Sequence, residues 1–265
     1  MRRIVVSIFA ASLLFASQAF AADMPVKAPP PPTAAPGWTG WYLGGNAGGF
    51  WGASRTTSAT TPIPGAGFTI AALAIINAQG APANIDTSGF TGGVQGGYNY
   101  QVGQWLVGLE ADFEAFHNKD TLTSAVPGVI AGSTFVLNST VNADWLLTVR
   151  PRLGWVANNW LLYGTGGLAV SRVSAAWNFT NPGGVPTFTE SASTASTKTG
   201  WTAGGGVETM LPGRWVVGVE YLYVKLGNIS TSAITISSVA GPINPFSHSV
   251  DFSSNIVRLR LSKAF

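Results

Sequence analysis

Segments in which apolar and polar residues alternate follow one another from Trp38 to the C-terminal Phe265. Successive side chains of a β-strand point to opposite faces, so this alternation predicts strands with one apolar and one polar face. The segments that show it are 40–52, 89–102, 105–118, 144–156, 160–176, 199–210, 214–227 and 250–265. The pattern therefore predicts an all-β chain of eight strands.

The connections between these segments alternate in length. Gly103-Gln104, Asn158-Asn159 and Pro212-Gly213 are tight connections with residues that favour hairpin turns. The other connections, near 53–88, 119–143, 177–198 and 228–249, are roughly 20 to 35 residues long. Short turns at one end and long loops at the other are typical of the periplasmic and extracellular ends of an outer-membrane barrel.

The composition agrees with a membrane barrel. Only 9% of the residues are charged, against about 25% in typical soluble domains. Beyond the N-terminus there is no apolar run of about 18 residues that could cross a membrane as a helix. Because only helices and closed barrels satisfy their backbone in lipid, we expect an eight-stranded antiparallel up-and-down transmembrane β-barrel, with short periplasmic turns and long extracellular loops.

The N-terminus has the pattern of a secretory signal peptide. Arg2 and Arg3 precede an apolar stretch over 4–15, and Ala19-Phe20-Ala21 offers a small-x-small cleavage pattern. We therefore assign 1–21 to a signal peptide that directs export. Removal of the signal peptide lowers the formal charge from +3 to about +1. The excess of basic over acidic residues is therefore no argument for nucleic-acid binding.

A proline-rich linker, 22–37, precedes the barrel domain, 38–265. Such a segment favours extended polyproline II and cannot join a sheet ladder. We interpret it as a periplasmic spacer; binding to peptidoglycan or another partner is the alternative. The chain has no cysteine, so it can form neither a disulfide nor a thiolate metal site.

An internal repeat supports the strand assignment. Gly89-Phe90-Thr91 returns as Gly200-Trp201-Thr202, and Trp105-x-Val107-Gly108-Leu109-Glu110 returns as Trp215-x-Val217-Gly218-Val219-Glu220. We interpret the two copies as similar hairpins half a barrel apart. Convergence on one strand pattern would give the same hairpin assignment.

Strand alternation also assigns the charged residues to the lumen. Carboxylates and guanidinium groups are costly in lipid, so the side chains that alternate with the apolar ones should face inward. These predicted lumen residues are Glu110, Asp112, Glu114, Arg150, Arg152, Glu208, Glu220, Arg258 and Arg260. They lie on neighbouring strands, which predicts an ion-pair network that fills and rigidifies the barrel. A catalytic role for the carboxylates would need a substrate cleft, and an eight-stranded lumen is only about wide enough for side chains.

Tryptophans lie near the predicted strand ends. Amphipathic rings at headgroup depth form two girdles in outer-membrane barrels. The predicted girdle residues are Trp41, Trp105, Trp160 and Trp215 beside the short turns, and Trp51, Trp145, Trp177 and Trp201 beside the long loops. Cofactor stacking is an alternative that the pattern does not require.

The C-terminal run 255–265 is an alternating strand that ends in an aromatic residue, with Val257, Leu259, Leu261 and Phe265 on one face. Together with Trp38-Thr39-Gly40-Trp41-Tyr42, it resembles the small porin-like major outer-membrane proteins of alphaproteobacteria. The resemblance extends over the whole mature chain. It implies an integral outer-membrane protein of a Gram-negative envelope, inserted by the barrel-assembly machinery through this C-terminal signal. Members of that family are described as envelope-stabilising, porin-like or haem-binding surface proteins.

The remaining residues offer little chemistry. His117 and His248 lie near predicted loop-side strand ends, and we interpret them as solvated rim residues; haem or metal capture, with Tyr223, is the alternative. Asp144 and His248 are rim candidates for a barrel hydrolase, but the sequence gives no ground to infer that they meet. We therefore expect no enzyme activity, cofactor or metal.

Three functions remain as hypotheses. The first is an abundant structural protein that stabilises the envelope, touching outer-membrane lipid and lipopolysaccharide and exposing loops to host or phage. Lys119, Lys198 and Lys225 are candidates for contact with lipopolysaccharide phosphates. The second is a porin-like channel for small solutes, and the third is a surface receptor or adhesin, including haem binding, that uses the long loops.

Overall fold

The computed structural model describes residues 37–265, except 65–66, 118–119 and 129–131. The predicted signal peptide, 1–21, and all of the predicted linker except Gly37 lie outside the described residues. The described part of the chain consists of strands and one helix. In chain order these are β1 (Gly40–Thr60), α1 (Ile70–Gln79), β2 (Ala83–Val102), β3 (Trp105–His117), β4 (Asp120–Pro127), β5 (Thr134–Ala157), β6 (Trp160–Thr180), β7 (Phe188–Leu211), β8 (Trp215–Leu226), β9 (Ile229–Ser237), β10 (Gly241–Asp251) and β11 (Ser253–Ala264).

Eight of the strands close into a ring. Neighbouring strands pair antiparallel in the order β1-β2-β3-β5-β6-β7-β8-β11. The last strand, β11, pairs with the first, β1, over the register Tyr42↔Ala264 to Gly52↔Ser254, which closes the ring. The tight connections lie between β2 and β3, β5 and β6, and β7 and β8. Gly103 and Gly213, and also Asn158, adopt positive φ at these connections, as two-residue hairpin turns require. The eight-stranded fold class is confirmed.

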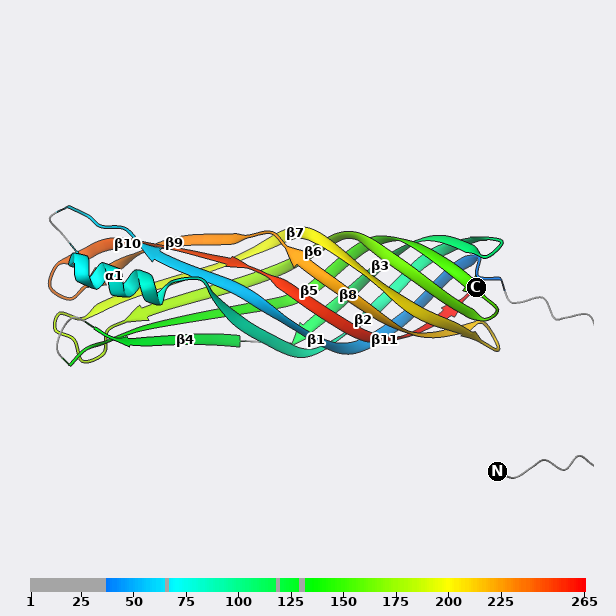
Figure 1. Ribbon diagram of the computed structural model, residues 1–265, viewed down its shortest axis with the longest axis horizontal. Helices are drawn as coiled ribbons and strands as arrows, with labels where there is room; N and C mark the ends of the chain where they lie inside the picture. Colours follow the sequence, from blue (N-terminus) through cyan, green and yellow to red (C-terminus); the bar gives the residue numbers. More distant parts are fainter. Residues whose placement is uncertain (1–36, 65–66, 118–119, 129–131) are drawn as a thin grey trace, which may run out of the picture. The chain divides into compact units, whose positions relative to one another are not determined.

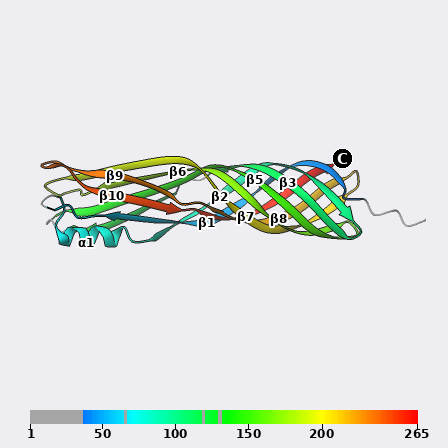
Figure 2. The ribbon, with the colours of Figure 1, turned by 90° about the horizontal axis from the view of Figure 1, so that it is seen from above.

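The long connections differ from the expectation of loops, because much of their length is regular structure. β1, β2, β5, β6 and β7 are 20–24 residues long, and β4, β9, β10 and α1 fill most of the rest. Beyond the ring, β10 pairs with β1 and β9, and β4 pairs with β5. Figures 1 and 2 show these strands continuing past the ring. We call this part the projecting section.

Helix α1 lies at the end of the projecting section (Figure 1). Thr69 caps its N-terminus by accepting a hydrogen bond from the Ala72 amide at 3.2 Å, as N-cap side chains do. The buried side chains of Ala72, Leu73 and Ile76 pack against phenylalanines of the strands. No helix within the described residues is both long and apolar enough to cross a membrane.

The polarity of the wall inverts along the molecule. In the ring, β6 directs Leu162 and Leu168 outward, whereas in the projecting section its outward residues include Asn178 and its inward ones Val173 and Trp177. β5 makes the same change at an irregularity between Ala143 and Trp145, where its pairing with β6 shifts register. An extra residue in a strand exchanges its two faces. The ring is therefore apolar outside, and the projecting section is apolar inside.

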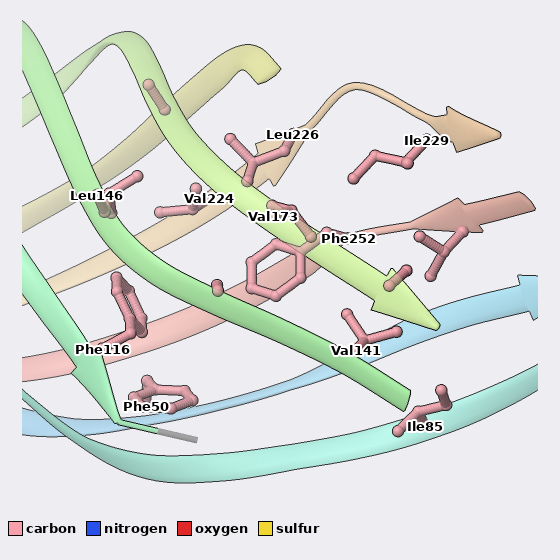
Figure 3. Close-up of a cluster of buried hydrophobic side chains, with 14 of the residues drawn as sticks. Phe50, Ile85, Phe116, Val141, Leu146, Val173, Val224, Leu226, Ile229 and Phe252 are labelled. Carbon is pink, nitrogen blue, oxygen red and sulfur yellow. The ribbon is translucent and has the colours of Figure 1, made fainter. Parts of the chain in front are cut away.

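The interior contains three layers. The lower plug, at the short-turn end of the ring, is an apolar cluster of Trp38, Leu106, Val156, Leu161, Tyr163, Met210 and Val216. The middle layer is charged and is described below. The upper core fills the inside of the projecting section. Figure 3 shows part of it, with Phe50, Phe116, Val173 and Leu226 pointing inward from different strands and Phe252 from the junction of β10 and β11.

Candidate functional site

The middle layer holds all the predicted lumen residues. β3 positions Glu110, Asp112 and Glu114; β5 positions Arg150 and Arg152; β7, β8 and β11 position Glu208, Glu220, Arg258 and Arg260. Each side chain points inward, and none of these residues is more than 4% exposed. The structure thus brings together every residue that strand alternation assigned to the lumen.

Two similar clusters face each other in this layer. Glu110 on β3 lies opposite Arg150 on β5, and Glu220 on β8 lies opposite Arg258 on β11. Arg150 contacts Glu110 at 2.7 Å, and Arg258 contacts Glu220 at 2.6 Å. The internal repeat of the sequence therefore appears as two copies of one ion pair in opposite halves of the ring.

Other contacts cross the lumen and join the two halves. Arg150 also reaches Glu220 at 3.3 Å, and Arg258 reaches Asp112 at 3.3 Å and contacts Glu114. Arg152 contacts Glu208 at 2.9 Å, and Arg260 contacts both Glu110 and Glu220. Because each arginine bonds carboxylates on more than one strand, the layer is a single network rather than a set of separate pairs.

Two tyrosines complete the network, and the sequence interpretation missed them. Tyr42 on β1 donates to Glu110 Oε2 at 2.6 Å and accepts from Arg152 Nη1 at 2.7 Å. Tyr163 on β6 donates to Glu220 Oε1 at 2.9 Å and accepts from Arg260 Nη1 at 2.8 Å. A signal was available, because each tyrosine follows an outward-facing residue (Trp41 or Leu162) in its strand and so must point inward.

A glycine makes room for each tyrosine. A Cβ atom on Gly97 would lie 2.5 Å from Tyr42 Oη, and one on Gly206 would lie 2.6 Å from Tyr163 Oη. Both glycines are register partners of the tyrosine that covers them. The two clusters therefore share a tyrosine, a glycine, a glutamate and an arginine in the same arrangement.

The network leaves little open space in the lumen. The cavity between it and the lower plug, lined by Trp38, Tyr42, Arg152 and Glu208, holds only about 10 Å³, room for a single water molecule. Above the network, the upper core closes the interior. Among the described residues, the network and the clusters below and above it fill much of the lumen, and its ion pairs can clamp the wall.

The predicted girdle tryptophans lie on the outer face, with one exception. Trp41, Trp105, Trp160 and Trp215 are 45–66% exposed near the short turns, and Trp51 and Trp201 are about half exposed at the other end of the ring. Trp145 stacks on the outward Phe113 with ring centroids 5.9 Å apart. The assignment of Trp177 is wrong, because its side chain is fully buried and its indole donates to Thr56 Oγ1 inside the projecting section.

The assignment of His248 to the solvated rim is also wrong. The residue is 1% exposed; Ser58 Oγ lies 2.8 Å from its Nδ1, and Glu190 Oε1 lies 3.2 Å from its Nε2. Its ring stacks on Trp177 at 4.9 Å. Asp144 is exposed on the outer face, so the structure does not unite it with His248.

The structure places the other sequence candidates as follows. His117 ends β3, its side chain outside the described atoms, and Lys119 lies outside the described residues. Lys225 is exposed, and Tyr223, near Trp201, is half-buried. Lys198 lies ten residues before Glu208 in β7, so its side chain points to the same inner face, and it is half-buried. Val257, Leu259, Leu261 and Phe265 of the predicted assembly signal are exposed on β11 or just after it.

A closed ring of eight antiparallel strands, with an apolar outer band between tryptophans and a charged lumen, defines a transmembrane barrel of the bacterial outer membrane. The chain belongs to the family of outer membrane protein beta-barrel domains, whose profile matches residues 7–239. It is an outer-membrane protein, and the family resemblance expected from the two ends of the sequence is confirmed.

The chain is similar to two named alphaproteobacterial proteins. It is 33% identical over 253 residues to the 31 kDa outer-membrane immunogenic protein of Brucella melitensis biotype 1, covering 92% of this chain and 95% of that protein. It is 31% identical over 137 residues to the 22 kDa outer membrane protein of Rhizobium leguminosarum bv. viciae, covering 52% and 53%. Among solved structures, OprG from Pseudomonas aeruginosa gives a TM-score of 0.43 at 13% identity, covering 86% of this chain and 97% of that one.

Proposed function

We propose that the protein is a non-conducting structural barrel that stabilises the cell envelope. The observation that supports this most directly is the lumen, which is occupied in succession by the lower plug, the ion-pair network and the upper core. A barrel built for solute passage would keep an open cross-section through these layers.

The pattern of ion pairs supports a mechanical role. Arg150 on β5 bonds carboxylates of β3 and β8, and Arg258 on β11 bonds carboxylates of β3 and β8. These bonds tie opposite walls of the ring together across its axis. Removing one partner of a buried pair typically costs about 3–5 kcal/mol because the other charge is left uncompensated, so the ring should resist deformation.

The first test is the conductance of the refolded mature barrel in a planar lipid bilayer. We expect no channel events under conditions in which a porin with an open pore, inserted as a positive control, conducts. Steady and reproducible channels from the wild-type protein would contradict the proposal and favour the porin-like alternative.

The second test concerns the envelope itself. We expect deletion of the gene to increase sensitivity to detergent, and the wild-type gene to restore resistance. An Arg258→Ala variant, compared at equal amounts in the outer membrane, should restore resistance only partly, because it keeps the surface but loosens the ring. Full resistance in the deletion strain would count against a stabilising role.

A further inference from the structure

Two cations lie on the outer wall at the level of the upper girdle, formed by Trp51, Trp145 and Trp201 where the projecting section begins. Arg172 on β6 and Lys225 on β8 are both exposed. Arg172 is the register partner of Trp145, and Lys225 is the register partner of Trp201. Register partners point to the same face of a sheet, so each cation stands beside a girdle tryptophan. Both charges therefore lie at the depth of the outer-leaflet headgroups.

The strands that carry these cations present no carboxylate on the outer face of this region. The outward residues of β7 between them, the odd-numbered ones over 191–199, are serine, alanine or threonine. The nearest exposed carboxylate is that of Asp144 on β5, beyond Arg172, and it accepts a hydrogen bond from Asn142 at 2.8 Å. Neither Arg172 nor Lys225 forms an ion pair with another described residue. Both are thus free to pair with an anion from outside.

The opposite wall has a different charge at this level. Arg55 on β1 is exposed there, but its register partner on β10 is the exposed Asp251. Asp86 on β2 is also exposed, and it lies opposite Ala53, two residues from Arg55. One cation with two carboxylates leaves that wall without an excess of positive charge. Among the described residues, the free positive charge of the outer face is therefore concentrated on β6 and β8.

A shallow groove of about 460 Å³ lies on the outer wall directly beyond Arg172. We call it the outer groove. It is lined from β5, β6 and β7 by Thr140, Asn142, Ser174, Ala175, Ala176, Ser193, Thr194 and Ala195. Ser174 is the next outward residue of β6 after Arg172, so the groove begins beside the cation and extends away from the membrane. Its hydroxyl and amide groups can exchange hydrogen bonds with the hydroxyls of a sugar, and its alanines leave room for one.

The vertical order of these features matches one kind of lipid. From the middle of the membrane outward, the wall presents exposed apolar side chains such as Leu168 and Trp201, then the two cations, then the outer groove. Lipopolysaccharide presents its acyl chains, phosphates and sugars in the same order. A phospholipid ends at its phosphate and a small headgroup, so it would leave the outer groove empty.

We infer that the outer face of β5–β8 binds outer-leaflet lipopolysaccharide through its phosphorylated sugar headgroup. Arg172 and Lys225 pair with the phosphates, as guanidinium and ammonium groups do, and the outer groove receives the sugars that follow. Of the lysines that the sequence suggested for this contact, Lys225 takes part, whereas Lys198 points to the inner face. Such anchoring rests on the stabilising function proposed above and names the envelope component that holds the barrel.

Native mass spectrometry of the mature protein in detergent micelles tests the binding. The probe is lipid A with both phosphates, and dephosphorylated lipid A and phosphatidylglycerol are the comparison ligands. We expect lipid A to bind most tightly. The double variant Arg172→Gln/Lys225→Gln should weaken its binding roughly 30-fold, or about fivefold for each cation removed from an anionic lipid surface. Arg55→Gln, which removes an exposed cation from the opposite wall, is the matched control and should bind like the wild type.

A further variant tests the outer groove. Ala195→Phe fills the groove but keeps both cations, so it should weaken binding of lipopolysaccharide with its core sugars and leave binding of lipid A unchanged.

Several results would overturn the inference. These are equal binding of lipid A by the wild type and the double variant, an equal loss in Arg55→Gln, equally tight binding of either comparison ligand, and unchanged binding of complete lipopolysaccharide by Ala195→Phe. The shift in gel mobility on heating shows whether each variant is folded. A detergent-sensitive deletion strain together with a barrel that does not bind lipid A would refute this anchoring alone and leave the stabilising function standing.

Discussion

At the residue scale, the lumen is built from one unit used twice. Tyr42, Gly97, Glu110 and Arg150 in one half correspond to Tyr163, Gly206, Glu220 and Arg258 in the other. In each unit the tyrosine hydroxyl bonds a glutamate of its own half and an arginine. The stability of the ring should therefore respond similarly to the same change in either half.

Removing one tyrosine hydroxyl tests this correspondence. We expect Tyr42→Phe and Tyr163→Phe each to lower the free energy of unfolding by about 1.5–3 kcal/mol, the usual contribution of hydrogen bonds to charged groups. Urea unfolding in lipid vesicles measures the change. Tyr221→Phe is the control, because that hydroxyl bonds Asn255 on the exposed outer face. A large loss in only one of the two lumen variants would argue against equivalent units.

The space above Gly97 gives a second prediction. We expect Gly97→Ala to destabilise the barrel by about 1–3 kcal/mol, the usual cost of overpacking, because its methyl group would displace Tyr42 from Glu110. Gly45→Ala is the matched control, since its nearest neighbour would be a carbonyl oxygen at 3.5 Å. The same unfolding measurement applies, and equal stability of the two variants would contradict the packing argument.

Strand parity predicted the nine charged lumen residues because every strand of the ring has a clear apolar face. Side chains an even number of residues apart in a strand lie on the same face. Trp177 is 14 residues from the inward Tyr163, and His248 is ten residues before the inward Arg258, so the same rule places both inside. Both were misassigned because they were judged by their nearness to strand ends. The partners of His248 on β1 and β7 come from the closure of the wall and have no local sequence signal.

At the scale of elements, the projecting section replaces most of the expected loops with strands. The sequence could not predict this, because segments such as 191–197 contain only small residues and have no apolar face. Helix α1 was missed because its run, Ile70 to Ile76, is apolar on all sides. Periodicity cannot separate a short helix of that kind from a strand. The helix is held at its C-terminal end by Asn77, which bonds the amide and the carbonyl of Thr60.

Replacing Asn77 should loosen this end of the molecule alone. We expect Asn77→Ala to speed amide exchange in α1 and in Ser58–Thr60 of β1, because their side-chain link is lost, while exchange in the ring stays unchanged. Hydrogen-exchange mass spectrometry measures both. Ile70→Ala is the control, since Ile70 is 86% exposed. Faster exchange throughout the ring would show that the two sections do not open independently.

At the scale of the whole molecule, the interior layers stand in series. A passage would have to cross the lower plug, the network and the upper core, so opening one layer leaves the others closed. We therefore expect an Arg150→Ala/Arg152→Ala variant to remain silent in a planar bilayer, although its unfolding free energy falls. Currents from this variant would show that the two apolar layers are permeable and that the network alone blocks the lumen.

The paired strands of the projecting section also limit how its length can change in evolution. A single residue inserted into a free loop alters only that loop. Inserted into β6 or β7, it would turn every later side chain of that strand to the opposite face and misalign all pairs beyond the insertion, up to the 21 register pairs of the two strands. Insertions and deletions should therefore accumulate at the tips, such as 181–187 and 238–240, or occur in compensating pairs on neighbouring strands. The surface that this protein presents to its surroundings can vary freely in side-chain identity but hardly in backbone length.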